Sequence, residues 1–178
     1  MHYKIIIGVL SLSYPFIVYW GLQNYGAALL LPLLFILLSL RWITGNQPGE
    51  RKVLIFSAFA LLLVVVCWGQ ALGLKFYPVI MNLGFLTLFA GSLFSSMTVV
   101  ERLARIKEPD LSDAGIAYTR KVTVVWSVFF LINGTVAAIT AVFFSNEIWV
   151  FYNGFIAYLL IGILATAEWF IRKKVRHN

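Results

Sequence analysis

The chain consists of long apolar runs that are separated by very short polar breaks. An α-helix rises about 1.5 Å per residue, so about 20 apolar residues suffice to cross the hydrocarbon core of a bilayer. Runs that approach or exceed this length cover residues 5–20, 27–43, 53–74, 78–97, 122–144 and 148–171. The pattern predicts an all-α, polytopic membrane protein with six transmembrane helices in a single domain over residues 1–178.

The composition supports lipid as the solvent of this chain. Of its 178 residues, 61% are hydrophobic and 12% are charged, whereas a soluble domain carries about 25% charged residues. The single cysteine, Cys67, lies inside an apolar run and excludes an internal disulfide or a CxxC site.

The basic residues predict the orientation. Six spans put both termini and the breaks 44–52 and 98–121 on one side, and this side holds all of the 14 Lys and Arg residues except Lys75. Because Lys and Arg are enriched in cytoplasmic loops, the termini are expected in the cytoplasm. The net charge of +7 is thereby explained without a nucleic-acid partner.

The segment 98–121 carries the longest run of charges, ERLARIKEPDLSDAGIAYTRK from Glu101. Its first part predicts an amphipathic cytoplasmic loop helix in which Glu101 and Arg105 can pair. Pro109 should end this helix, and Ser112 or Asp110 should cap a second short helix that leads into the fifth span. The candidate contacts to lipid headgroups or to a protein partner are Arg102, Arg105, Lys107, Asp110, Tyr118 and Arg120. The alternative is a solvated loop without a specific partner.

Few polar side chains interrupt the spans, and the candidate intramembrane polar cluster is Asn82, Asn133, Asn153 and Glu168. Side-chain amides in lipid need hydrogen-bond partners, so the three asparagines serve either as contacts between helices or as the wall of a polar pocket. Glu168 lies one helical turn before Arg172, which favours an ion pair at the inner boundary.

Two further patterns concern the packing of the helices. Tyr14-Pro15 and Tyr77-Pro78 open similar short segments in runs of opposite direction, as in the inverted repeats of transporters. Small residues such as Gly91 and Gly134 permit close helix contacts, within one chain or in a homo-oligomer.

Catalytic motifs are absent from the sequence. The histidines, His2 and His177, lie at opposite ends of the chain, and no Gly-rich phosphate loop, HExxH or GxSxG motif occurs. The loop carboxylates follow no metal-binding spacing. We therefore expect no enzyme, no cofactor and no metal.

The second half resembles the intracellular septation protein A family of bacterial inner-membrane proteins. The resemblance runs from about Tyr77 to Tyr158, through Leu88-Phe89-Ala90-Gly91-Ser92-Leu93, Trp126-Ser127-Val128-Phe129-Phe130-Leu131 and Asn146-Glu147-Ile148-Trp149-Val150. A closer similarity is to uncharacterised membrane proteins encoded in aryl-polyene or ketosynthase-type gene clusters. It is carried by Tyr77-Pro78, Glu108-Pro109-Asp110-Leu111, Tyr118-Thr119-Arg120, Asn133-Gly134 and Tyr152-Asn153-Gly154. The resemblance implies an inner-membrane protein of cell-envelope biogenesis.

The sequence thus favours a non-enzymatic scaffold or accessory factor whose loop 98–121 meets membrane lipids or a cytoplasmic or membrane protein. The alternative is a small lipid or metabolite transporter or flippase built around the asparagines. A third hypothesis is a membrane enzyme that acts on acyl lipids through the loop carboxylates.

Overall fold

The computed structural model describes residues 2–25 and 69–175, together with isolated positions between Ile36 and Val66. Within this part of the chain all regular structure is helical and no strand occurs, which confirms the all-α prediction. The expected span 27–43 and most of the expected span 53–74 lie outside the described residues.

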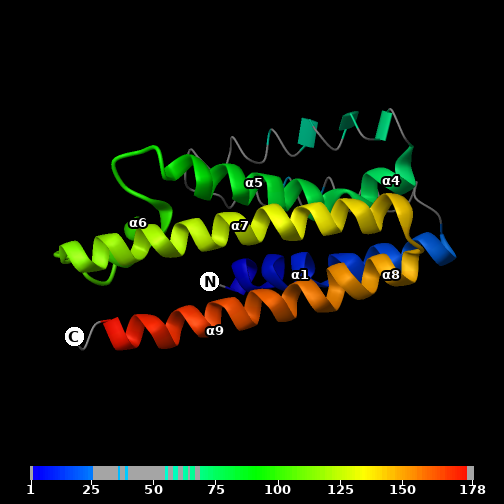
Figure 1. The fold of residues 1–178 in the computed structure, drawn as a ribbon. Coiled ribbons are helices and arrows are strands. Elements are labelled where there is room, and N and C mark those ends of the chain that lie inside the picture. Colours follow the sequence, from blue (N-terminus) through cyan, green and yellow to red (C-terminus); the bar gives the residue numbers. More distant parts are fainter. Residues whose placement is uncertain are drawn as a thin grey trace.

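Four long helices run side by side along one axis and form an elongated bundle (Figure 1): α1 (His2–Asn24), α5 (Tyr77–Ser92), α7 (Asp113–Phe143) and α9 (Ala157–Val175). The short helices α4 (Gln70–Lys75) and α8 (Asn146–Phe151) lie at one end, and a π-helical turn, η1 (Tyr152–Ile156), joins α8 to α9. The short helix α6 (Val99–Arg105) lies at the other end, toward which both termini point.

Two helical stretches of the described chain are long and apolar enough to cross a membrane. They are Asp113–Phe143 and Asn146–Arg172, and α5 is a shorter apolar helix. The most apolar windows of the two stretches are only 39% and 22% buried in the bundle. Most of their apolar side chains therefore face outward, unlike those of a core helix in a soluble protein.

The third predicted run is not one continuous helix. Gly69, just before α4, has φ +91°, in a region of backbone space that glycine enters at little cost. By contrast, α1 runs through Pro15 without a break and is longer at both ends than the predicted span 5–20.

Helix α5 ends at Ser92, five residues before the predicted end of the fourth span. Serine hydroxyls compete for the backbone there: Ser92 Oγ donates to the Phe89 carbonyl (2.7 Å) and accepts from the Val99 amide (3.0 Å). Ser95 Oγ also bonds the Ser92 carbonyl (2.8 Å). Such local bonds offer the chain an alternative to the helix.

Helix α7 begins at Asp113, nine residues before the predicted start of the fifth span, 122–144. Ser112 is its N-cap, and its side chain accepts a hydrogen bond from the Gly115 amide (3.2 Å). Of the two predicted caps the structure therefore uses Ser112 rather than Asp110. The expected second short helix is the first part of α7 itself.

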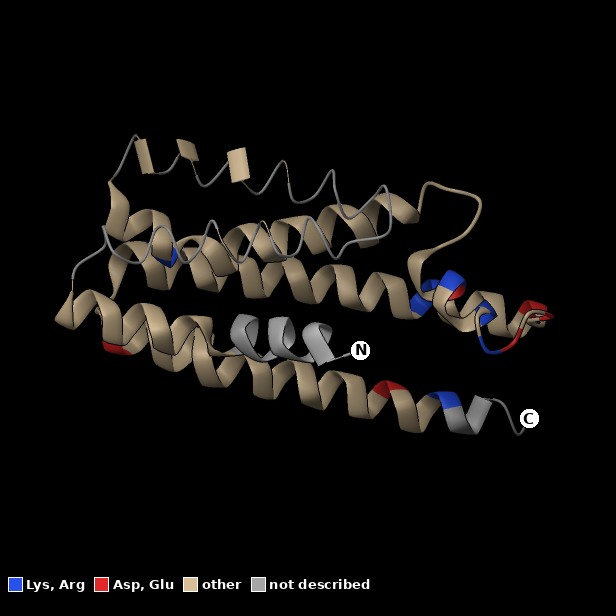
Figure 2. Cartoon of the chain, turned by 180° about the vertical axis from the view of Figure 1, so that it is seen from behind, with Lys and Arg blue, Asp and Glu red and all other residues tan. Residues whose placement is uncertain are grey.

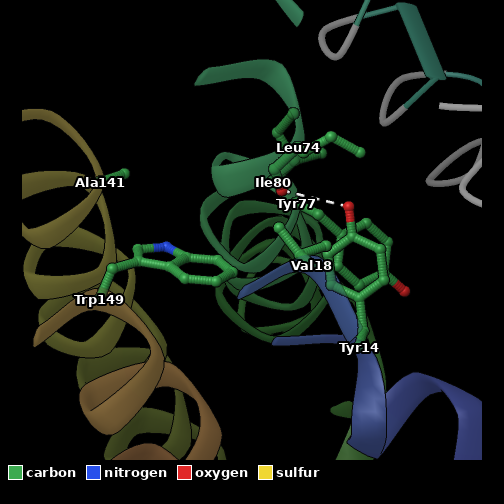
Figure 3. Packing of buried hydrophobic residues seen from close by; sticks show 7 residues of the cluster. All are labelled: Tyr14, Val18, Leu74, Tyr77, Ile80, Ala141 and Trp149. Carbon is green, nitrogen blue, oxygen red and sulfur yellow. Dashed lines mark hydrogen bonds between the residues drawn. The ribbon is translucent and has the colours of Figure 1, made fainter. Parts of the chain in front are cut away.

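The bundle core lies near the α4 and α8 end (Figure 3) and consists of Tyr14, Val18, Leu74, Tyr77, Ile80, Ala141 and Trp149. The rings of Tyr14 and Tyr77 are 4.3 Å apart. The Tyr14 hydroxyl donates to the Leu74 carbonyl (3.1 Å), and Trp149 Nε1 donates to the Lys75 carbonyl (3.1 Å). The polar atoms of the buried rings thus bind the backbone carbonyls at the end of α4, as buried tyrosine and tryptophan require.

Candidate functional site

Two of the predicted asparagines meet in the middle of the bundle. Asn133 of α7 donates through Nδ2 to Asn82 Oδ1 of α5 (3.0 Å), and its own Oδ1 accepts from the Tyr152 hydroxyl (2.9 Å). Asn82 Nδ2 donates in turn to the Pro78 carbonyl (2.8 Å). One row of hydrogen bonds therefore ties α5 and α7 to the π-helical turn.

The third asparagine, Asn153, lies inside this turn and is 4% exposed. Its Nδ2 donates to the Trp149 carbonyl (2.9 Å) and to the Thr140 hydroxyl of α7 (3.3 Å). Asn153 is thus held by one bond to α7 and one to α8, separately from the bonds of Asn133.

A cavity of about 350 Å³ lies beside these side chains. Asn82, Asn133 and Asn153 all line it, so the structure brings the three predicted amides to one place. The other lining residues come mainly from apolar and aromatic side chains of α1, α5, α7 and α9: Tyr14, Pro15, Tyr77, Pro78, Met81, Phe85, Phe130, Ala157, Tyr158 and Ile161. Both Tyr-Pro pairs of the sequence therefore face the same cavity.

Glu168 does not belong to this cluster. It is absent from the cavity wall, and its backbone carbonyl accepts a hydrogen bond from the Tyr118 hydroxyl (3.1 Å). Glu168 and Arg172, both within the described part of the chain, do not form the expected ion pair. Glu168 was grouped with the asparagines only because it is a polar residue within an apolar run, and it lies far along α9.

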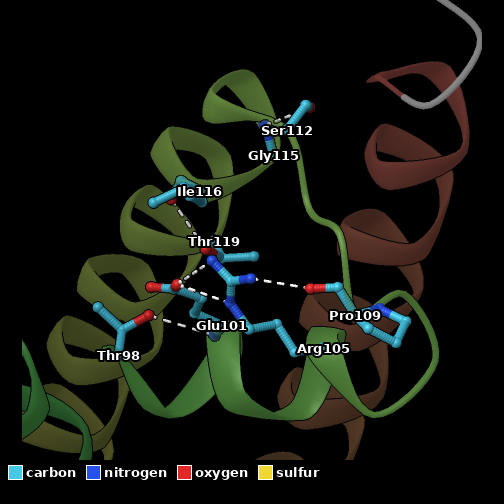
Figure 4. A network of polar contacts seen from close by, with 8 residues as sticks. All are labelled: Thr98, Glu101, Arg105, Pro109, Ser112, Gly115, Ile116 and Thr119. Carbon is cyan, nitrogen blue, oxygen red and sulfur yellow. Dashed lines mark hydrogen bonds and ion pairs between the residues drawn. The ribbon is translucent and has the colours of Figure 1, made fainter. Parts of the chain in front are cut away.

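At the other end of the bundle, α6 packs through a polar side chain (Figure 4). Glu101 is 5% exposed and binds Arg105 Nε and Nη2 at 3.0 Å each. Arg105 Nη1 also donates to the Pro109 carbonyl (2.9 Å), while the Thr98 hydroxyl caps the helix at the Glu101 amide (3.2 Å). The predicted Glu101–Arg105 pair is confirmed, and it fixes the fold of the loop.

The predicted amphipathic face of α6 does not point into the protein. Ala104 is buried beside Glu101, whereas Leu103 and Ile106 are 59% and 78% exposed. The apolar side chains of the loop are therefore available to lipid or to a partner.

The six predicted contact residues divide into two groups. Arg105 is engaged as above, Arg120 Nη2 donates to the Leu93 carbonyl after the end of α5 (3.0 Å), and Tyr118 binds Glu168. Arg102, Lys107 and Asp110 are exposed, and none of these three forms an ion pair within the described part of the chain. Most charged side chains of the described chain concentrate at this end of the bundle (Figure 2). Lys75 in α4 and Glu147 in α8 belong to the opposite end.

Lys75 is largely buried, and its Nζ lies 3.5 Å from the Phe144 carbonyl. Burial lowers the pKa of its ammonium group, and the Glu147 carboxylate partly opposes this effect. As for metals, no group of three His, Cys, Asp or Glu side chains gathers among the described residues.

Comparison with known proteins adds one relationship. No family model matches the chain, and no solved structure matches it. The chain is 28% identical to the inner membrane-spanning protein YciB of Marinomonas sp. (strain MWYL1). The alignment extends over 173 residues and covers 94% of this chain and 91% of that protein. The resemblance to the intracellular septation protein A family is thus supported by a homologue, the inner membrane-spanning protein YciB. The closer similarity to proteins of aryl-polyene or ketosynthase-type gene clusters stays a prediction.

Proposed function

We propose that the chain is a non-enzymatic, six-span inner-membrane protein with cytoplasmic termini that serves cell-envelope biogenesis as a scaffold. Its partner is a cytoplasmic or membrane protein of an envelope pathway, either septation or the synthesis of an acyl or aryl-polyene lipid. The inner-membrane setting is supported by the relative, and the cytoplasmic side of α6 by the distribution of the basic residues.

The observation that carries this proposal is the corner formed by α6 and the start of α7. The pair between buried Glu101 and half-buried Arg105, together with the Arg120 bond to the Leu93 carbonyl, ties this corner to the bundle. On it, the exposed apolar side chains of Leu103 and Ile106 lie beside exposed basic residues. A fixed apolar patch with a basic rim fits an acidic amphipathic segment of a partner protein.

The test is photocrosslinking in native membranes from a photoreactive residue at Ile106, with the same residue at Phe143 as the control. Both positions are 78% exposed, but Phe143 lies at the opposite end of the bundle. We expect the photoreactive residue at position 106 to crosslink to a specific acyl-carrier, ketosynthase or divisome protein, and the residue at position 143 to give no such adduct. Lipid adducts alone from both positions would contradict the scaffold.

The charge dependence of the same crosslink is a second test. Arg102→Glu and Lys107→Glu should remove the protein adduct and leave the fold intact, because neither side chain is used within the described structure. Reversal of Arg105 or Arg120 is unsuitable, since it would break the bonds that hold the corner itself.

A second candidate function is the binding or transport of a small apolar molecule, and the amide-lined cavity favours it. Cavities of about 300–1,000 Å³ with apolar walls and a few convergent polar groups are typical ligand sites. In reconstituted vesicles, Asn133→Leu and Asn153→Leu should lose uptake of the molecule but keep expression. The control is Thr135→Val, whose exposed hydroxyl only bonds the Leu131 carbonyl of its own helix (2.8 Å); equal uptake by all three variants would exclude transport through the cavity.

A further inference from the structure

The polar wall of the cavity has hydrogen-bonding capacity that the protein does not use. Within the described chain, Asn153 Oδ1 accepts no hydrogen bond, although this side chain is 96% buried. Asn82 and Asn133 each use one of two amide hydrogens. A buried acceptor without a donor costs about 1–3 kcal/mol, so this wall is suited to a group that both donates and accepts.

The π-helical turn is what directs Asn153 to this place. Such turns insert one residue into an α-helix and occur frequently at functional sites. The turn is packed closely against α1, because a Cβ atom on Gly154 would lie 2.8 Å from the ring of Phe16. The turn that carries Asn153 is thus packed against α1 at Gly154, and the Asn153 side chain is bonded to α7 through Thr140.

No charged side chain lines the cavity among its described residues. A carboxylate, phosphate or ammonium group would lose its hydration there without gaining a partner of opposite charge, which is costly. The wall therefore selects a neutral polar group.

The apolar wall is largely aromatic. The rings of Phe85 and Phe130 stack with centroids 5.1 Å apart, and the aromatic contacts continue away from the amides through Phe89 and Trp126. This row of rings gives an apolar, aromatic surface along α5 and α7 that begins at Phe85 and Phe130 in the cavity wall. An extended hydrocarbon chain fits it better than a compact polar molecule does.

We propose that the cavity binds a neutral, long-chain molecule through a terminal hydroxyl group, which donates to Asn153 Oδ1 and accepts from Asn82 or Asn133, while its chain lies on Phe85 and Phe130. This inference rests on the second candidate function and names the class of its ligand. It does not depend on the corner at α6.

The test uses the full chain in phosphatidylcholine vesicles and a hexadecanol that carries a photoreactive diazirine. Hexadecanol, hexadecanoate, hexadecylamine and hexadecane compete for labelling. We expect hexadecanol to compete best, by about tenfold over each of the others, since the loss of one or two buried hydrogen bonds corresponds to about this factor. Equal competition by hexadecane, or better competition by the carboxylate or the amine, would overturn the proposal.

Two variants locate the site. Asn153→Leu should abolish the preference for the alcohol over the alkane, whereas Thr166→Val should keep it, because the exposed Thr166 hydroxyl only bonds the Gly162 carbonyl (2.7 Å). Ala157 lines the cavity and is 6% exposed. Ala157→Phe should therefore reduce labelling, because the larger side chain fills the cavity. Unchanged labelling in Ala157→Phe would overturn the site even if Asn153→Leu does not fold.

The same vesicles separate this inference from transport. Selective labelling without uptake of the alcohol would support the ligand site and contradict the transport function. Uptake without any preference for the alcohol would support the transport function and contradict the proposed class of ligand.

Discussion

Asn133 is the side chain that connects most of the membrane-embedded polar structure. It donates to α5 through Asn82 and accepts from η1 through Tyr152, so one buried amide orients three neighbouring elements. Hydrogen bonds between membrane helices are individually modest, about 0.6 kcal/mol on average. Their effect here lies in fixing the relative rotation of the helices.

This arrangement predicts a non-additive pair of substitutions. Tyr152→Phe should lower the free energy of unfolding by about 0.5–1.5 kcal/mol, because it removes one hydrogen bond and leaves the ring in place. Combined with Asn133→Leu it should cost less than the sum of the two single changes. Reversible unfolding in mixed micelles measures the cycle, with Tyr25→Phe at an exposed tyrosine as the control; additive effects would contradict a shared bond.

Lys75 predicts a pH dependence. Its pKa is lowered by burial, so the folded state holds this proton less firmly than the unfolded state. Stability should then rise with pH between the lowered pKa and the unfolded value of about 10.4. Lys75→Met should raise the melting temperature near neutral pH, and the gain should shrink as the pH approaches about 10.

The matched control for Lys75 is Lys121→Met, because Lys121 is an exposed lysine. It should leave the melting temperature nearly unchanged at every pH in the series. A gain from Lys75→Met that stays constant over the whole pH range would show that the proton on Lys75 does not matter.

Sequence reasoning found the asparagines of the site but not the hydroxyl groups that bind them, those of Tyr152 and Thr140. Tyr152 precedes Asn153 directly, and adjacent residues of a helix point in different directions, so nothing in the spacing joined Tyr152 to Asn133. Glu168 was included because it is polar and lies within an apolar run, but it does not line the cavity. Contact depends on where along each helix a residue lies and on which way the helix faces.

At the scale of elements, α5 and α7 approach each other closely at one glycine. A Cβ atom on Gly134 would lie 3.0 Å from Asn82 Cβ, which is tighter than ordinary van der Waals contact. The predicted close contact at a small residue is confirmed at this position. Gly91, by contrast, is exposed, and among the described residues no atom of a neighbour would lie within 4 Å of a Cβ placed there.

The two glycines therefore form a matched pair for mutation. Gly134→Val should separate α5 from α7, break the Asn82–Asn133 bond and destabilise the protein by about 1–3 kcal/mol through overpacking. Gly91→Val should have a far smaller effect, although it introduces the same side chain into the same type of helix. Thermal unfolding of both variants in one detergent compares them, and equal losses would contradict the packing at Gly134.

The ends of the elements explain most of the boundary errors. Hydropathy extends the fourth span to residue 97, but it does not register the serine bonds that end α5 at Ser92. It starts the fifth span at 122, because the charged first turns of α7 are helical without being apolar. The π-helical turn leaves no mark in the apolar pattern at all.

At the scale of the whole molecule, the distribution of charge predicts which end faces the cytoplasm. In a Cys67→Ser background, cysteines at Lys107 and at Glu147 should be labelled from opposite sides of the membrane. A membrane-impermeant maleimide should reach Glu147→Cys in intact spheroplasts and Lys107→Cys only after lysis. Labelling of both positions from the same side would exclude the proposed orientation.

The helical class and the clustering of charge at one end could be predicted, because each follows from one general property of membrane proteins. Helical structure follows from lipid as the solvent, and the clustering of charge at one end follows from the sidedness of insertion. The polar wall of the cavity was one of the two alternatives for the three asparagines, and all three line it. Its aromatic wall could not be predicted, because it depends on how α1, α5, α7 and α9 are arranged around one another.

The contact of Phe16 with Gly154 brings two irregular turns to the same level of the bundle. On one side of it Pro15 removes a backbone amide donor from α1, and on the other the π-helical turn replaces regular α-helical bonds. Regular α-helical hydrogen bonding is therefore interrupted in two neighbouring helices at one level, while α7 passes this level as an uninterrupted helix. Since Pro15 and Asn153 both line the cavity, the described bundle is hollow at the level where two of its helices depart from regular hydrogen bonding.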